Sequence, residues 1–172
     1  GDTDKAISSL AKLLDLDAGD LDALSLLEKI YRDVEDYERL CETMDRRAEV
    51  LGDSGDMVGL RVEMGSLRLD KLNDVPGAIE AYEEVLELEA GNSKALVALE
   101  QLYSRQNQWP DVSRILEQRV NASTRDSERE TLLFRLAHVE ERELSDLAAA
   151  IGHYEAVLAL NPLHETAVDD LI

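Results

Sequence analysis

Carboxylates are the most abundant side chains in this chain that could carry out acid–base chemistry. The 172 residues include 38 Asp and Glu against 18 Lys and Arg, which gives a net charge of −20 at pH 7. Some acids are adjacent in sequence, as Glu83 is to Glu84 and Glu140 is to Glu141. On a helix, adjacent side chains point about 100° apart, so neither pair converges on one reacting atom. We interpret these pairs as parts of solvated helix faces.

Histidine and cysteine are the other residues that could bind a metal or act in catalysis. His138, His153 and His164 are isolated in sequence, and only His138 with Glu141 has the spacing of two ligands on one helical face. The single cysteine, Cys41, has no histidine near it in sequence and cannot form an internal disulfide. The chain also lacks a glycine-rich phosphate loop. We therefore predict that the protein is not an enzyme and that it needs no metal or cofactor.

The apolar residues of the chain recur at the spacing of amphipathic helices. Between residues 78 and 88, for example, apolar side chains recur at helical spacing and glutamates occupy the intervening faces. No window shows the strict alternation of a β-strand. Ten helices are predicted, at about 4–17, 21–34, 37–51, 56–72, 76–89, 93–106, 110–122, 127–144, 147–160 and 164–172.

Residues typical of helix ends occur at several of these boundaries. Pro76 and Pro110 fall in a first helical turn, where a missing N–H removes no helical hydrogen bond. Asp146 precedes a helix, where the helix dipole favours negative charge. Ser127 and Glu130 have the spacing of a capping box, which predicts that Ser127 caps the helix of residues 127–144.

The chain repeats itself at a distance of 72 residues. The dipeptide Ala-Ile occurs at Ala6, Ala78 and Ala150 (78 − 6 = 150 − 78 = 72). When residues 1–100 are aligned with 73–172 without a gap, about a quarter of the positions are identical. Self-similarity on this scale is typical of solenoids, in which each unit packs against its neighbours. We therefore predict a repeat array that presents a surface, and not a domain built around a reaction centre.

Equivalent points in alternate helices are separated by 34 and 38 residues in turn, as Ala6, Leu40 and Ala78 are. A helix–turn–helix of 34 residues is the period of the tetratricopeptide repeat (TPR). The chain resembles that family, and it departs from the family's pattern at Glu28 and Glu100, where the family prefers glycine. The residues that fit the pattern are Leu24, Leu27, Tyr31, Tyr37, Met64-Gly65, Ala78, Tyr82, Leu96, Leu99, Tyr103, Trp109, Leu136-Ala137, Ala150, Tyr154 and Pro162.

The resemblance covers essentially the whole chain, as a degenerate array with alternating 34- and 38-residue units like those of large multi-repeat bacterial proteins. It implies an all-α fold, a right-handed α-solenoid of antiparallel helix pairs. Residues 1–172 would form a single repeat array, itself a fragment of a longer one. Ala78 and Ala150 would lie at close contacts between helices.

The resemblance also implies where a partner would bind. In TPR proteins the first helix of each unit lines a concave groove, across which a protein or peptide partner lies. Lys29, Arg32 and Arg105, the basic residues in this groove, could bind an acidic peptide, or they could form salt bridges with neighbouring acids. The groove residues do not reproduce the Lys and Asn clamp of the co-chaperone TPR proteins. The candidates by alignment are Lys29, Arg32, Gln101, Arg105, Phe134 and His138.

The charge and hydropathy of the chain argue against nucleic-acid binding and against membrane insertion. Nucleic acid is disfavoured because phosphate binding needs clustered Lys and Arg. No stretch of 18 apolar residues is present, so membrane insertion is not predicted. The compartment is not specified by any signal, and a cytoplasmic location is favoured.

A structural role, in which repeats stack end to end, is the alternative to an interaction scaffold. Solenoids need polar capping helices, and neither end of this chain has the pattern of one. Ile7, Leu10 and Leu14 at the start would form one exposed apolar patch, and Val168 with Leu171 and Ile172 would form another. Such patches would favour self-association through the ends.

Overall fold

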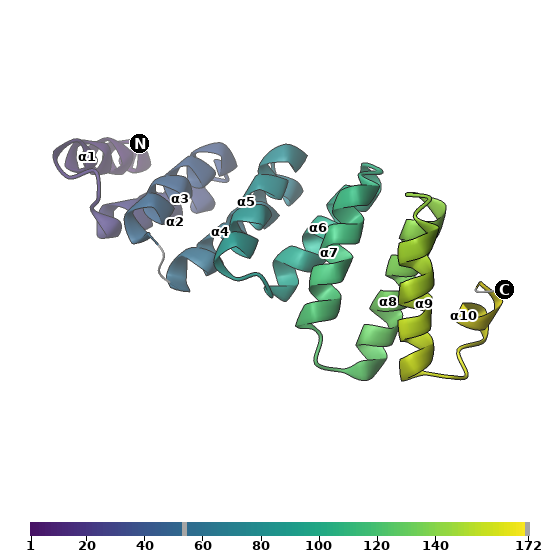
Figure 1. Cartoon of the computed structure of the whole chain (residues 1–172). Coiled ribbons are helices and arrows are strands. Elements are labelled where there is room, and N and C mark those ends of the chain that lie inside the picture. The colour runs from purple at the N-terminus through teal and green to yellow at the C-terminus, as the bar shows by residue number, and fades with distance from the viewer. Residues whose placement is uncertain (53–54, 171–172) are drawn as a thin grey trace. The chain divides into compact units, whose positions relative to one another are not determined.

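The computed structural model describes residues 1–52 and 55–170, and these form ten α-helices and no β-strand (Figure 1). The all-α fold predicted from the sequence is therefore confirmed. Each helix overlaps one of the predicted segments. The helices are α1 (Asp2–Leu16), α2 (Leu21–Asp33), α3 (Tyr37–Leu51), α4 (Gly55–Asp70), α5 (Val75–Leu88), α6 (Ser93–Arg105), α7 (Trp109–Ala122), α8 (Asp126–Arg142), α9 (Leu147–Leu160) and α10 (Glu165–Asp169).

The helices belong to two compact units, an N-terminal unit (Gly1–Leu88) and a C-terminal unit (Glu89–Ile172). Consecutive helices pack against one another inside each unit, α1 to α5 in the first and α6 to α10 in the second. The prediction of one continuous array concerns how the two units are joined, and it stays a prediction.

Several helices have a side-chain cap at their first turn, and the caps of α2 and α6 lie at equivalent points of the repeat. Asp20 Oδ1 accepts a hydrogen bond from the Ala23 N–H at 2.9 Å, and Asn92 Oδ1 accepts one from the Ala95 N–H at 3.2 Å. Asp146, as predicted, caps α9, because its Oδ1 accepts from the Ala149 N–H at 3.1 Å. Each cap satisfies one of the N–H groups that have no partner within the helix.

The predicted capping box at Ser127 is wrong. Helix α8 begins one residue earlier, at Asp126, with Arg125 at the N-cap and no side-chain hydrogen bond there. Ser127 lies inside the first turn, where its carbonyl accepts a hydrogen bond from the Thr131 hydroxyl. Asp126 and Glu128 supply negative charge in the first turn, and the helix dipole favours that charge without a capping box.

The four turns that join α2 to α3, α4 to α5, α6 to α7 and α8 to α9 share one backbone feature. Each contains a residue with positive φ, namely Glu35 (58°), Asn73 (52°), Asn107 (55°) and Ser145 (56°). This left-handed conformation is strained for most residues and is least costly for Gly and Asn. A residue with positive φ therefore occurs in the turn of each of these four helix hairpins, although its type differs.

The core of the N-terminal unit is formed where α1 to α5 face one another. Leu24, Leu40, Met44 and Met64 are fully buried there. Leu14 is also buried, and Ile7 and Leu10 are half-buried against the same core. The sequence-based expectation that these three residues form an exposed patch is therefore wrong, because α1 packs its apolar face on α2.

At the other end of the chain, Val168 is exposed. Leu171 and Ile172 lie outside the described residues. The core of the C-terminal unit next to this end contains Leu133, Ala137, Ala150, Tyr154 and Val157. Ala150 is buried, and its equivalent Ala78 is buried in the N-terminal unit, as expected for small residues at close contacts between helices.

Gly65 in α4 marks a close approach to α5. A Cβ at this position would lie 2.7–2.9 Å from ring atoms of Tyr82. The ring has little freedom to move, because Tyr82 is buried and its hydroxyl lies 3.0 Å from Ser66 Oγ. Gly65 therefore allows α4 and α5 to pack around this tyrosine.

We expect the variant Gly65→Val to lower the free energy of unfolding by about 1–3 kcal/mol, because the added side chain must displace the Tyr82 ring from a packed core. Gly59→Ala in the same helix is the matched control. A Cβ there meets no atom within 4 Å, so the better helix propensity of alanine should raise stability by about 0.5–1 kcal/mol. Urea denaturation followed by circular dichroism measures both effects. Equal stability of the two variants would show that the contact with Tyr82 is unimportant.

Candidate functional site

The predicted partner-binding residues of the N-terminal unit, Lys29 and Arg32, are exposed on α2. They follow Ser25 at intervals of four and three residues, so the three side chains share one face of the helix. Arg32 Nη2 lies 2.5 Å from Glu63 Oε1 on α4, so this cation already has a salt bridge. Among the described residues no ion pair is found for Lys29. Lys29 is thus the freer of the two to meet a partner.

Gln101 and Arg105 are both exposed and lie one turn apart on α6. Within the part of the chain that the structure describes, Arg105 has no ion-pair partner. The side chains of this helix that face the other way, such as those of Leu99 and Glu100, are buried. Helix α6 therefore leaves a polar stripe outside the core, as α2 does.

Phe134 and His138, on α8, are brought together in a half-buried cluster of rings. Their ring centroids are 4.5 Å apart, and Phe134 also packs against His164 at 4.6 Å and Tyr154 at 5.9 Å. His138 Nε2 lies 3.5 Å from an Asp170 carboxylate oxygen. These two predicted site residues therefore contact side chains that come from α9 and from the α10 region.

Two buried ion pairs lie next to these stripes, and the sequence analysis did not predict them. Glu28 of α2 is 5 % exposed, and its Oε2 lies 2.5 Å from Arg47 Nη1 of α3. Glu100 of α6 is 2 % exposed and pairs in the same way with Arg119 of α7. The signal was available, because both residues of the pair are identical in the two copies of the repeat. Each glutamate stands where the family prefers glycine.

The two glutamates differ in what their second oxygen contacts. Glu100 Oε1 lies 2.5 Å from Arg135 Nη1 of α8. The equivalent of Arg135, 72 residues earlier, is Glu63 on α4, an acid that cannot donate to Glu28. Glu28 Oε1 is buried and has no hydrogen-bond partner. Burial raises the pKa of Glu28, and Arg47 and Arg32 oppose this effect only in part.

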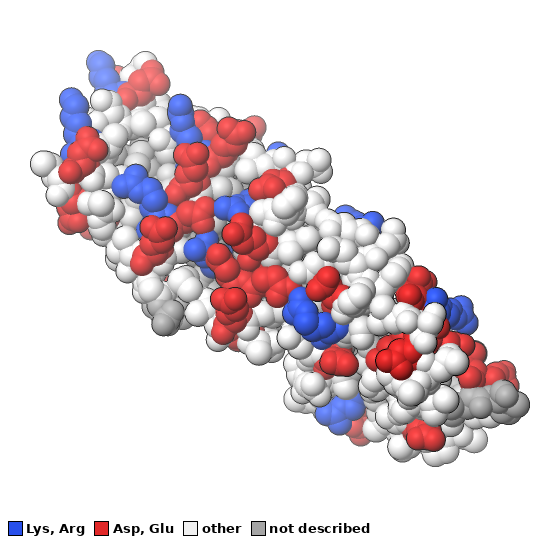
Figure 2. All heavy atoms as spheres, turned by 45° about the horizontal axis from the view of Figure 1, so that its top comes forward, with Lys and Arg blue, Asp and Glu red and all other residues white. Residues whose placement is uncertain are grey.

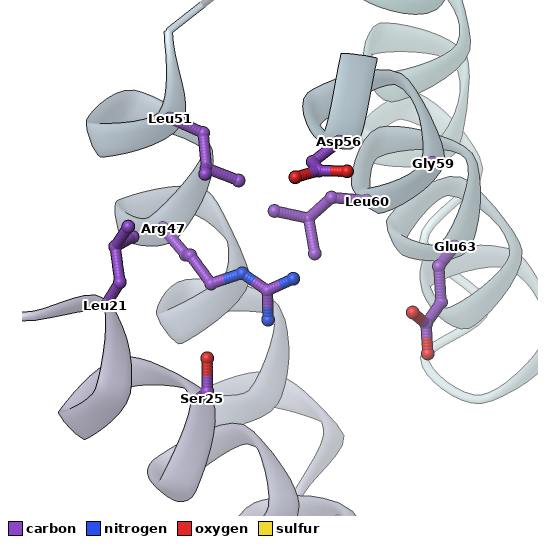
Figure 3. A pocket seen from close by; sticks show the side chains of 8 residues that line it. All are labelled: Leu21, Ser25, Arg47, Leu51, Asp56, Gly59, Leu60 and Glu63. Atoms are coloured by element: carbon purple, nitrogen blue, oxygen red, sulfur yellow. The ribbon is translucent and has the colours of Figure 1, made fainter. Parts of the chain in front are cut away.

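A pocket lies between α2, α3 and α4 (Figure 3), and one of its lining residues is Arg47, the ion-pair partner of Glu28. Its cavity volume is about 460 Å³. The guanidinium of Arg47 points into it, Ser25 and Leu60 lie on its walls, and the carboxylates of Asp56 and Glu63 lie at its edge. The pocket is therefore polar, and its lining carries more acid than base.

A smaller pocket, of about 190 Å³, occupies the equivalent place between α6, α7 and α8. Five of its lining residues are the repeat equivalents of residues that line the larger one. They are Ser93, Val97, Arg119, Ser123 and Glu128. The repeat thus builds the same pocket twice and with different electrostatics.

Burial also shifts the pKa of two other titratable groups, Cys41 and Glu140. Burial raises the pKa of the Cys41 thiol, which disfavours the reactive thiolate. Burial also raises the pKa of Glu140, and the His153 ring nitrogen 2.6 Å away partly offsets this. Glu141 accepts a hydrogen bond from the Tyr154 hydroxyl.

The wider surface has no concentrated basic region on the face shown in Figure 2, where Lys and Arg lie singly among more numerous Asp and Glu. The described residues contain no group of three or more His, Cys, Asp or Glu side chains that could hold a metal ion. His138 and Glu141 thus do not converge with a third such ligand. Nor does any helix in the described ranges have the length and apolar character needed to cross a membrane.

We expect Arg47→Met to lower the free energy of unfolding by about 3 kcal/mol, because it leaves a buried carboxylate without a cation within bonding distance. Arg119→Met is the matched variant in the other copy of the repeat. It should cost less, about 1–2 kcal/mol, because Glu100 keeps Arg135. Urea denaturation of the full chain measures both. A larger loss for Arg119→Met would contradict the assigned contacts.

The pH dependence of stability tests the burial of Glu28. Its folded pKa lies above the ordinary value of 4.5, so its contribution to stability is complete below pH 4.5 and is lost as pH rises through the folded pKa. Glu28→Gln keeps the side chain neutral at every pH. We expect the free energy of unfolding of this variant to fall less steeply between pH 4.5 and 7 than that of the wild type.

The variant Glu38→Gln, which removes the same charge from an exposed position of α3, accounts for the change in net charge. Urea denaturation at half-unit pH steps gives both profiles. A steeper fall for Glu28→Gln than for the wild type would show that the environment of Glu28 favours its ionised form.

Comparison with known proteins agrees with this arrangement of helices. The tetratricopeptide repeat model matches residues 23–58 and 95–130, which contain most of α2–α3 and of α6–α7. No curated protein matches the chain in sequence.

Three solved structures are similar over most of their length. They are MamA (18% identity, TM-score 0.51, 94% of this chain and 84% of that chain), PilF of Pseudomonas aeruginosa (15%, 0.51, 94% and 70%) and YrrB, described as a TPR protein with an unusual peptide-binding site (15%, 0.50, 98% and 83%). At these identities the likeness shows a shared fold. The family match and the helix hairpins together show that this chain carries tetratricopeptide repeats, at residues 23–58 and 95–130.

Proposed function

We propose that the chain is a non-catalytic protein-interaction scaffold. It would bind a segment of a partner polypeptide on the first helices of its repeats, which are α2 and α4 within the N-terminal unit and α6 and α8 within the C-terminal unit. The observation that carries the proposal is that two of these helices, α2 and α6, leave a polar stripe out of the core. On α2 the stripe is Ser25, Lys29 and Arg32, while Leu24 and Leu27 of the same helix are buried.

The chemistry of the stripes favours a polypeptide partner with acidic residues. Lys29 and Arg105 are exposed cations in a chain of net charge −20, and each could make charge-assisted hydrogen bonds to a carboxylate. Gln101 lies one turn from Arg105 and could bond to a partner's main chain through its amide. The cluster of Phe134 and His138 would offer ring surface to an apolar side chain.

The state of the titratable groups supports a role without catalysis. Cys41 is buried, and Glu140 and Glu141 are each bonded to a side chain of α9. A nucleophile or general base must instead reach a substrate atom. The repeat family's general use as an interaction module points the same way.

Self-assembly of the chain is the alternative proposal, and exposed leucines favour it. Leu16 at the end of α1 is 87 % exposed, and Leu163 before α10 is 86 % exposed. Leu13, also on α1, is exposed as well. Large exposed apolar residues that lie together often mark association sites.

The charge-reversed double variant Lys29→Glu/Arg105→Glu tests the scaffold proposal. Peptides that bind the wild-type chain are first selected on an array of short peptides, and their affinities are then measured for the variant. We expect a loss of about tenfold or more, because two favourable contacts become repulsive. Circular dichroism should show an unchanged helical melt, since both side chains are exposed.

The variant Lys12→Glu/Arg46→Glu is the control. It makes the same change in net charge on α1 and α3, which are not first helices of a repeat. An equal loss of affinity in the control, or no loss in the test variant, would move the binding surface elsewhere. Sedimentation velocity over a wide concentration range tests the alternative proposal of self-assembly. Self-assembly would make the measured mass rise with concentration, and Leu16→Asp should reduce that rise.

A further inference from the structure

We infer that the pocket between α2, α3 and α4 receives the guanidinium of an arginine side chain from a partner polypeptide, which binds the buried carboxylate of Glu28 and the neighbouring Glu63. The inference rests on the proposed scaffold function and names the side chain that the partner would insert. Ser25, part of the exposed stripe on α2, lies on the wall of this pocket, so one bound segment could reach both.

The first argument is the state of Glu28. Its side chain is more than nine-tenths buried, and Arg47 contacts only one of its two oxygens. The other oxygen, Oε1, has no hydrogen-bond partner. Leaving a charged oxygen buried and without a donor is costly, so a donor that reaches Oε1 would bind with a gain that a solvated carboxylate cannot offer.

The second argument comes from the other copy of the repeat, which shows what such a donor looks like. In the C-terminal unit the equivalent oxygen, Glu100 Oε1, is bound by the guanidinium of Arg135. The side chain of Arg135 is 53 % exposed, whereas that of Glu100 is 3 % exposed. A guanidinium that enters from the solvent side can therefore reach a carboxylate as deeply buried as Glu28.

The third argument is charge. The carboxylates of Asp56 and Glu63 and the guanidinium of Arg47 line the larger pocket. Arg47 is paired with Glu28, and Glu63 is paired with Arg32, so this group of charges contains three carboxylates and two guanidiniums. Each guanidinium is already paired with one of the carboxylates, which leaves an excess of one negative charge. An incoming cation is attracted by this excess, whereas an incoming carboxylate would meet Asp56 and Glu63 at the edge of the pocket.

Arginine fits this site better than lysine because of its shape. A guanidinium has five N–H donors in a planar fork, so it can contact Glu28 and Glu63 at the same time, whereas an ammonium group is a compact point charge. The volume available, about 460 Å³ against about 190 Å³ in the C-terminal unit, leaves room for a side chain to enter.

The test uses the full chain and the capped peptide Gly-Gly-Arg-Gly-Gly as probe. Binding is followed by NMR through the amide signals of Ser25, Gly59 and Leu60, which line the pocket. We expect these signals to shift and saturate with the arginine peptide. The same peptide with citrulline, the neutral isostere of arginine, should bind at least about tenfold more weakly because it lacks the charge-assisted bonds. The lysine peptide should lie between the two.

The repeat supplies matched variants. Arg32→Ser/Glu63→Arg copies into the N-terminal unit the residues of the C-terminal unit, Ser104 and Arg135. It should lose binding by about tenfold or more, because its own arginine would occupy Glu28. The reverse exchange, Ser104→Arg/Arg135→Glu, should create a second site, seen as new shifts at Val97 and Leu132. Circular dichroism checks that each variant is folded, and Glu63→Gln, which keeps the shape of the side chain, replaces the double variant if that one is not.

Three results would overturn the inference. They are equal binding of the arginine and citrulline peptides, unchanged binding by Arg32→Ser/Glu63→Arg, and tighter binding of Gly-Gly-Glu-Gly-Gly, which would make Arg47 an anion site. The scaffold proposal would survive any of them if Lys29→Glu/Arg105→Glu still weakens binding of the array-selected peptides. If neither site responds, both proposals fail together.

Discussion

A carboxylate can stay ionised inside this protein only with a cation beside it, and this constraint shapes half of its helix hairpins. Glu28 and Glu100 occupy the position at which a tetratricopeptide repeat usually brings two helices together over a glycine. Here Arg47 and Arg119 reach across from the second helix to meet them. Since breaking a buried pair leaves an uncompensated charge, each pair holds its two helices in one register.

In the remaining hairpins the equivalent position is occupied by a small residue that packs near a tyrosine ring, and not by an ion pair. In α4–α5 the position belongs to Gly65, and the Tyr82 ring fills the space that a side chain would have taken. In α8–α9 it belongs to Ala137, which is buried in the same cluster as Tyr154. Charged and aromatic hairpins thus alternate along the chain, and this alternation is a physical reason why the sequence repeats every two hairpins and not every one.

The two charged hairpins differ in whether the second oxygen of the buried glutamate has a partner, and this difference bears on function. Duplicated sites diverge when a single residue changes sign, and Glu63 in place of an arginine leaves Glu28 half-satisfied, whereas Arg135 completes the shell of Glu100. The completed site stabilises the fold. The incomplete site has a polar pocket next to the exposed stripe of α2. We propose that a partner supplies there the contact that Arg135 supplies within the chain in the other copy.

The sequence by itself determined the helices, their repeat and the family, because helical spacing of apolar residues and a 72-residue period are properties of the chain read in order. It failed at the cap of α8 and at the apolar face of α1, where the outcome depends on which of several acceptable contacts forms. Only the tertiary structure decided that Glu28 meets Arg47, that Arg32 is occupied by Glu63, and that Phe134 and His138 pack with His164. These contacts join residues on different helices, and their energies depend on burial and on distances of a few ångströms, which no pattern of spacing along one helix contains.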